Sequence, residues 1–209
     1  MKPLQTLLAV SFQRWFKLLA GLILFGIGIA LMKQSQLGLS PWEVLHDGIS
    51  KVSGIQIGTI SILIGIVVLL LWIPMREKPG IGTILNILIV GNVTNLTLTV
   101  LPVSTQLLMQ IIWLALGLLM IGLASALYLS SRLGAGPRDG LMMSLYRQTS
   151  FSIRLIRSVM EVGVLLVGWL LHGTIGIGTL AFALGIGPII QLMFRLIGDH
   201  ELASNRNRT

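Results

Sequence analysis

Long apolar runs recur along the chain, and short polar, proline-containing or glycine-containing breaks separate them. A helix that crosses a bilayer needs about 20 mostly apolar residues. Six runs come close to or exceed this length, and they cover residues 15–34, 56–74, 81–101, 107–129, 153–171 and 176–197. The pattern therefore predicts an all-α membrane protein with six transmembrane helices.

Two shorter segments begin at a proline and follow the first and the fourth apolar run. Each combines a cap residue, a proline at the first helical position and an acid at the capping-box position: Ser40, Pro41 and Glu43 in the first, and Gly136, Pro137 and Asp139 in the second. Both predicted helices end near residues 53 and 149, so they are too short to span. Each either lies flat at the interface, with its acid only capping the helix, or enters the membrane with its N-terminus facing a buried site.

The chain resembles itself at a shift of 96 residues, without a gap. Among the pairs brought together are Gly38 with Gly134, Pro41 with Pro137, Glu43 with Asp139, and the GIGT segment 80–83 with 176–179. Each copy holds three runs, an odd number, so the second copy enters the membrane from the opposite side. This predicts a 3+3 inverted-topology repeat, of residues 15–101 and 107–197, with an N-terminal segment 1–14 and a polar tail 198–209.

Composition and charge agree with the apolar pattern. Of the residues, 54% are hydrophobic and 11% are charged, against roughly a quarter charged in soluble proteins. If the N-terminus is inside, thirteen of the 15 lysines and arginines lie on the inner side, and only Lys33 and Lys51 lie outside. Both termini are thus predicted cytoplasmic. The net charge of +8 follows from topology, so nucleic acid is not an expected partner.

Polar side chains inside an apolar chain are the candidates for function. The third run contains Asn86 and Asn92, which either join helices by hydrogen bonds or line a polar pathway. Glu161 lies in the fifth run, one turn after Arg157, where it forms an ion pair or contacts a solute. The candidate solute-binding residues are Glu43, Asn86, Asn92, Arg138, Asp139 and Glu161.

Other polar and glycine-rich positions have simpler interpretations. The two GIGT segments are expected to be helix entries with close packing: Gly80, Gly82 and Thr83 in the first, and Gly176, Gly178 and Thr179 in the second. Pro188 has no proline counterpart, because Asn92 occupies the corresponding position. His46 and Asp47 are interpreted as exposed interfacial polarity, with a proton relay as the alternative. Cysteine is absent and the histidines are scattered, so no metal and no cofactor is expected.

The segments LGLSPWEVLHDGIS and LGAGPRDGLM, with the paired GIGT entries, resemble the YczE/YyaS/YitT family of bacterial integral membrane proteins. The motif positions are Gly38, Pro41, Gly134, Pro137, Gly176, Gly178 and Thr179. The resemblance implies a small inner-membrane protein of transporter-like character. Some members are associated with pyridoxal-phosphate-binding regulators, which suggests vitamin B6 or amino metabolites. The resemblance carries over no catalytic residues.

These observations predict a protein that moves a small polar or anionic solute across the bacterial plasma membrane by alternating access, rather than an enzyme. Its partners would be the lipid bilayer and an unknown small molecule, and six short spans are compatible with a homodimer. One alternative is an enzyme that uses Glu43, His46 and Asp47 as acid and base groups. Another is a non-transporting membrane partner in regulation or assembly, which needs no polar cavity.

Overall fold

The computed structural model describes residues 12–199 and residue 202, and these form eight α-helices and no strand. Six long helices coincide with the six apolar runs: α2 (Phe12–Ser35), α4 (Ile57–Trp72), α5 (Ile81–Val100), α6 (Leu107–Ser130), α8 (Ile153–Leu170) and α9 (Ile177–Leu196). The Pro-started helices are α3 (Pro41–Ser53) and α7 (Pro137–Gln148). Both begin at the prolines predicted to start them, and Pro188 lies inside α9.

Four helices, α2, α5, α6 and α9, are long and apolar enough to cross a membrane on their own. Helix α4 has only 16 residues, but α3 and α4 together pass the same test as a pair bent by 115°. Helix α8 contains three charged residues, Arg154, Arg157 and Glu161. Among the described residues, length and composition therefore identify four membrane spans, or five if the bent pair counts as one.

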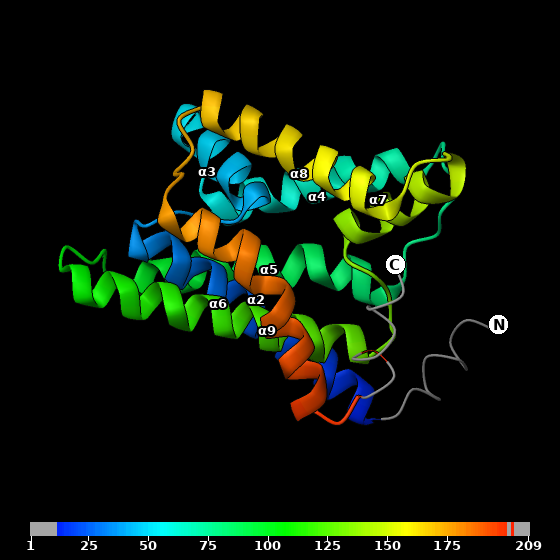
Figure 1. Ribbon diagram of the computed structural model, residues 1–209, viewed down its shortest axis with the longest axis horizontal. Coiled ribbons are helices and arrows are strands. Elements are labelled where there is room, and N and C mark those ends of the chain that lie inside the picture. Colours follow the sequence, from blue (N-terminus) through cyan, green and yellow to red (C-terminus); the bar gives the residue numbers. More distant parts are fainter. Residues whose placement is uncertain (1–11, 200–201, 203–209) are drawn as a thin grey trace.

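The helices form two layers (Figure 1). One layer has the order α5, α2, α6, α9, and the other contains α3, α4, α7 and α8. Helix α4 packs along α5 and joins the layers. Large aliphatic side chains such as Leu108 and Leu184 cover the outer surface, as lipid contact requires.

The antiparallel pair α2 and α6 forms the centre of the first layer. A Cβ added at Gly21 would lie 2.8 Å from the backbone N of Tyr128, and one at Gly117 would lie 2.9 Å from the carbonyl oxygen of Gly28. Small residues let helix backbones approach this closely, which is a main source of helix association in membranes. Substitution of these glycines would therefore push the central helices apart.

Turns after α2 and α6 hold the entries of α9 and α5. The N–H of Gly178 donates to the carbonyl of Leu37 at 2.7 Å, and the N–H of Gly82 donates to the carbonyl of Leu133 at 2.9 Å. The interpretation of the two GIGT segments as closely packed helix entries is confirmed. The two contacts also occupy positions 96 residues apart in the chain.

Helix α3 is buried along its first two turns, with Pro41 and Glu43 to Gly48 inside the protein. The flat placement at the lipid surface does not fit this helix, because α3 packs between α4 and α8. The predicted capping box at α3 is wrong. Ser40 has the extended backbone of an N-cap residue, but its hydroxyl makes no capping hydrogen bond, and the Glu43 carboxylate is turned toward Arg138.

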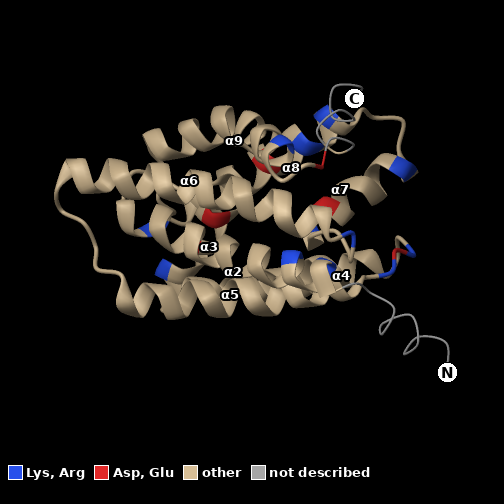
Figure 2. Cartoon of the chain, turned by 90° about the horizontal axis from the view of Figure 1, so that it is seen from below, with Lys and Arg blue, Asp and Glu red and all other residues tan. Residues whose placement is uncertain are grey.

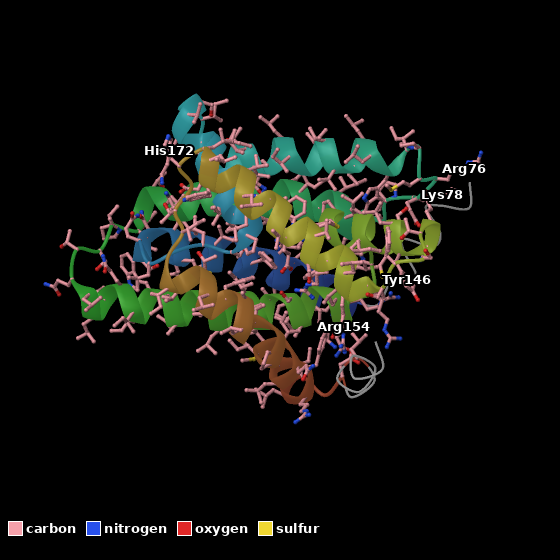
Figure 3. The ribbon with its side chains drawn as sticks, turned by 45° about the horizontal axis from the view of Figure 1, so that its top comes forward. Arg76, Lys78, Tyr146, Arg154 and His172 are labelled. Carbon is pink, nitrogen blue, oxygen red and sulfur yellow. The ribbon has the colours of Figure 1, made fainter. Side chains whose placement is uncertain are left out.

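Charged side chains gather mainly at the end of the molecule that holds α7 (Figure 2). Arg76, Lys78, Tyr146 and Arg154 lie at this end, and His172 lies at the other (Figure 3). This separation is the one that the count of lysines and arginines predicts for the two faces of a membrane. The predicted N-terminal segment 1–14 falls mostly outside the described residues, and so does the predicted polar tail 198–209.

Candidate functional site

Two pockets lie between the helix layers. The first pocket has a volume of about 590 Å³, which includes space open to solvent, and is lined by α2 to α7. The second pocket has a volume of about 760 Å³ by the same measure and is lined by α2, α3 and α6 to α9. The two pockets share one wall, formed by Phe25, Trp42, Tyr128, Arg138 and Asp139.

Positions 96 residues apart line the two pockets. The correspondences include Glu43 with Asp139, His46 with Met142, Ser61 with Arg157, Gly65 with Glu161, Asn86 with Phe182, and Val90 with Ile186. The prolines are exchanged as well, since Pro137 lines the first pocket and Pro41 the second. The pockets therefore correspond in position and differ in chemistry.

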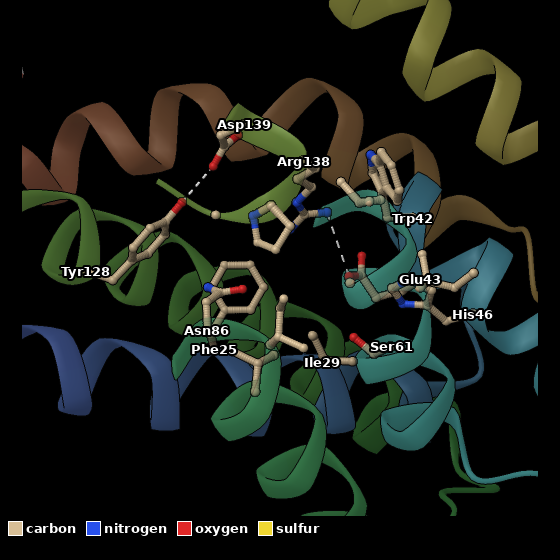
Figure 4. Close-up of a pocket in the computed structure, with 17 residues that line it drawn as sticks. Phe25, Ile29, Trp42, Glu43, His46, Ser61, Asn86, Tyr128, Arg138 and Asp139 are labelled. Atoms are coloured by element: carbon tan, nitrogen blue, oxygen red, sulfur yellow. Dashed lines mark hydrogen bonds and ion pairs between the residues drawn. The ribbon is translucent and has the colours of Figure 1, made fainter. Parts of the chain in front are cut away.

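Arg138 occupies the wall between the pockets, in the first turn of α7 (Figure 4). Its guanidinium lies 3.8 Å from Oε1 of Glu43 and 5.7 Å from the centroid of the Phe25 ring. Among the described residues, Arg138 donates no hydrogen bond, and 31% of its side chain is accessible. An arginine with an aromatic ring on one side and unused donors on the other is suited to holding an anion.

The other charges of the site are held differently. The Tyr128 hydroxyl donates to Oδ2 of Asp139 at 2.7 Å, and the Tyr128 ring meets Phe25 edge to face. The indole N–H of Trp72 donates to the carbonyl of Pro137 at 3.1 Å and so fixes the start of α7. Asp139 is thus fixed in place, whereas Glu43 has only a long ion pair.

His46 follows Glu43 by one turn of α3 and also faces the first pocket. It is only 6% exposed, and its Nε2 has no hydrogen-bond partner in the described structure. Buried polar atoms are normally satisfied, so this ring nitrogen in the pocket wall is available to a ligand.

Asp47 points away from the pockets and is 1% exposed. Its carboxylate pairs with Lys33 and with Lys51 and accepts two hydrogen bonds from Thr174, at 2.8 Å from the backbone N and 2.7 Å from the hydroxyl. The interpretation of His46 and Asp47 as exposed polarity is wrong, because both side chains are buried. Asp47 joins α3 to the end of α2 and to the loop after α8.

The comparisons with known proteins agree on one family. A model described as a family of unknown function (DUF6198) matches residues 12–195. The chain belongs to DUF6198. An uncharacterized protein of Haemophilus influenzae is 41% identical over 180 residues, which are 86% of this chain and 83% of that protein.

Two Bacillus subtilis proteins confirm the resemblance found in the motifs. The uncharacterized membrane protein YczE is 34% identical over 85% of this chain and 84% of its own length. The uncharacterized protein YyaS is 30% identical over 89% of this chain and 94% of its own length. No solved structure matches. This DUF6198 chain is a membrane protein with several transmembrane helices.

In this DUF6198 chain, the first pocket brings together four of the six predicted solute-binding residues: Glu43, Asn86, Arg138 and Asp139. Glu161 lines the second pocket and accepts a hydrogen bond from Nε of Arg157 at 2.9 Å, so the predicted ion pair is present. Asn92 is not brought to either pocket. Its side chain is exposed and donates to the carbonyl of Leu88 in its own helix.

Sequence reasoning missed the aromatic wall of the site. Phe25 and Tyr128 lie within apolar runs, where an aromatic residue carries no periodic signal. Tyr128 could still have been found, because it is the only tyrosine inside any of the six apolar runs. A hydroxyl in such a run needs a polar partner, and here that partner is Asp139.

Proposed function

We propose that the protein carries a small polar or anionic solute across the bacterial inner membrane by alternating access. The observation that carries the proposal is the pair of corresponding pockets that meet at Arg138. Carriers built from inverted repeats place their site at the repeat interface, and short helices point N-termini at the solute. One chain lines both pockets, so the site requires no second copy.

The helices that flank the two pockets are not equally close. At the first pocket, α4 packs against α5, and a Cβ at Gly58 would collide with the carbonyl oxygen of Gly91. Asn95 ties the same pair together: its Oδ1 accepts from the N–H of Gly58 at 2.8 Å, and its Nδ2 donates to the Thr59 hydroxyl at 3.0 Å. The helices α4 and α5 are therefore in close contact near Gly58, which is the outer part of the pair in the proposed topology.

The corresponding pair, α8 and α9, is open. Among the described residues these helices barely touch, and they diverge from the loop that joins them toward the start of α8 and the end of α9 (Figure 1). A Cβ at Gly187, the counterpart of Gly91, would meet nothing within 4 Å. The second pocket lies between these helices, with Glu161 on one and Phe182 on the other.

This difference supports a carrier in an inward-open state. In the proposed cycle, α8 closes onto α9 while α4 separates from α5, so that the first pocket opens to the outside. The proposal includes six spans in a 3+3 inverted repeat and cytoplasmic termini. The contacts that recur 96 residues apart and the charges gathered at one end support both points.

A cross-linking experiment tests the cycle without knowledge of the solute, because the chain has no native cysteine. The pair Thr59→Cys with Asn95→Cys should cross-link in the present state, and the corresponding pair Leu155→Cys with Gln191→Cys should trap the opposite state. Reporters Ile64→Cys and Met160→Cys, one in each pocket, are labelled with an impermeant maleimide from either side of oriented vesicles.

The first cross-link should leave Met160→Cys reactive from the cytoplasm and protect Ile64→Cys, and the second should reverse both results. Unchanged labelling under both cross-links would refute alternating access and favour the non-transporting membrane partner. Cysteines at Ser53 and Thr149 should report opposite sides of the membrane, and labelling from one side would refute the inverted repeat. A thermal-shift screen with B6 vitamers and amino acids is the first search for the solute.

A further inference from the structure

We propose that Arg138 binds the carboxylate of a small organic monoanion, which displaces Glu43, and that the displaced Glu43 takes up one proton. The binding step concerns the first pocket alone. The further statement that the proton crosses the membrane with the solute rests on the proposed function. The proposal thus names the substrate class of the site and the ion that accompanies it.

The guanidinium of Arg138 is the first element of this site. Arginine carries five N–H donors in a planar fork that fits the two oxygens of a carboxylate or phosphate. Among the described residues none accepts a hydrogen bond from it, and Glu43 at 3.8 Å is beyond hydrogen-bond distance. Donors in a pocket wall are normally used by an acceptor. The fork is therefore free for a bidentate ligand.

The neighbouring acids select a monoanion. Glu43 and Asp139 both line the pocket with Arg138, so a dianionic phosphate would meet two like charges and one opposite charge. Asp139 is held by Tyr128, whereas Glu43 is held only by its long ion pair. A carboxylate can take the place of Glu43 at the guanidinium without moving Asp139.

The other residues that line the first pocket indicate the chemistry of the rest of the ligand. Phe25, Ile29, Val68 and Val90 form the apolar part of the first pocket's lining, and Ser61 and Asn86 add uncharged polar contacts. The site therefore fits a compact carboxylic acid with an aromatic or aliphatic body.

Displacement of the Glu43 carboxylate from Arg138 accounts for the uptake of a proton. The Glu43 side chain is only 7% exposed, and a buried carboxylate without its cation is costly. Protonation of Glu43 removes that charge. His46 lies one turn along α3 and faces the same pocket, and its Nε2 has no hydrogen-bond partner in the described structure. One carboxylate and one proton enter together, so the net charge of the pocket is unchanged.

The charged and titratable groups near Glu43 are few. They are His46 on its own helix, Tyr128, Arg138 and Asp139 in the shared wall, and Arg157 and Glu161 on α8 in the second pocket. Arg157 and Glu161 neutralise each other. Asp47 lies one turn away and belongs to a separate cluster with Lys33 and Lys51.

Binding is tested by calorimetry on the purified full chain in detergent micelles. The probes are benzoate, benzamide and phenyl phosphate, which share one body and differ in charge, together with straight-chain acids from acetate to octanoate. At least one monocarboxylate should bind, with benzamide and phenyl phosphate at least about tenfold weaker than benzoate. Arg138→Lys keeps the charge but loses the fork and should weaken carboxylate binding about tenfold or more. Arg147→Lys, in an exposed ion pair with Glu77 outside both pockets, is the matched control and should leave binding unchanged.

Proton uptake is measured by repeating the titration in buffers with different ionisation enthalpies. The wild type should take up about one proton per carboxylate bound, and Glu43→Gln should bind carboxylate with none. The site is refuted if no monocarboxylate binds the wild type, or if folded Arg138→Lys binds as tightly as wild type. Binding without proton uptake would refute the role of Glu43. If binding and uptake are as expected but the cross-linking test fails, the site stands and transport does not.

Discussion

Gly38→Ala should destabilise the protein far more than an alanine at another glycine with a positive φ. Gly38 has φ of +124°, a backbone conformation that L side chains rarely adopt, and a Cβ there would lie 2.8 Å from the backbone N atoms of Gly176 and Thr179. Backbone strain of this kind costs about 1–3 kcal/mol, and overpacking of a tight contact costs about 1–3 kcal/mol more. We therefore expect a loss of roughly 2–6 kcal/mol in the free energy of unfolding.

Gly54→Ala is the matched control for backbone strain alone. Gly54 caps α3 with φ of +73°, but a Cβ there would have no neighbour within 4 Å. Its loss should be about 1–2 kcal/mol. The assay is reversible unfolding in mixed micelles, followed by tryptophan fluorescence. Equal losses for Gly38→Ala and Gly54→Ala would show that the turn after α2 does not hold the entry of α9 as described.

Three other substitutions test separate parts of the structure by the same unfolding assay. Asp47→Asn leaves Lys33 and Lys51 without their carboxylate and should cost about 1–3 kcal/mol; no loss would mean that α3 is held by packing alone. Tyr128→Phe removes the 2.7 Å hydrogen bond to Asp139 and should cost about 1–2 kcal/mol. It should also weaken carboxylate binding, because Asp139 becomes free to occupy Arg138, and unchanged affinity would contradict this. Arg147→Ala breaks an exposed ion pair with Glu77 and should cost less than about 1 kcal/mol.

The helices of this protein were readable from sequence because each rests on a local signal. Long apolar runs set the six long helices, and Pro41 and Pro137 fixed the starts of α3 and α7 to the residue. The 96-residue shift matched Gly38 with Gly134 and one GIGT segment with the other, and in the fold Gly38 lies against Gly176 and Thr179 while Gly134 lies against Gly80 and Thr83. Because the repeat has no gaps, the turns after α2 and α6 contact the entries of α9 and α5 at equivalent positions.

The burial of the polar residues could not be predicted from the sequence, because it depends on which helices surround them. Asp47 and His46 lie on a short helix with a polar sequence, and only the packing of α3 between α4 and α8 places them inside. Asn92 and Asn95 share a helix, yet Asn95 ties α5 to α4 while Asn92 faces outward. The tertiary fold decides which neighbour each helix face contacts, and on α5 that neighbour changes within three residues.

The exchange of Arg138 for Trp42 between the two halves bears on how a carrier of this kind would work. Trp42 occupies the position that corresponds to Arg138, and both residues belong to the wall shared by the pockets. A chain with arginine at both positions would place two guanidinium groups in this wall and would bind two anions or repel one. In the proposed carrier, the single guanidinium that lines both pockets would let one bound carboxylate face either side of the membrane without leaving its anchor. This arrangement suits a single-site carrier, since the helices around the solute must move while the charge that holds it stays in place.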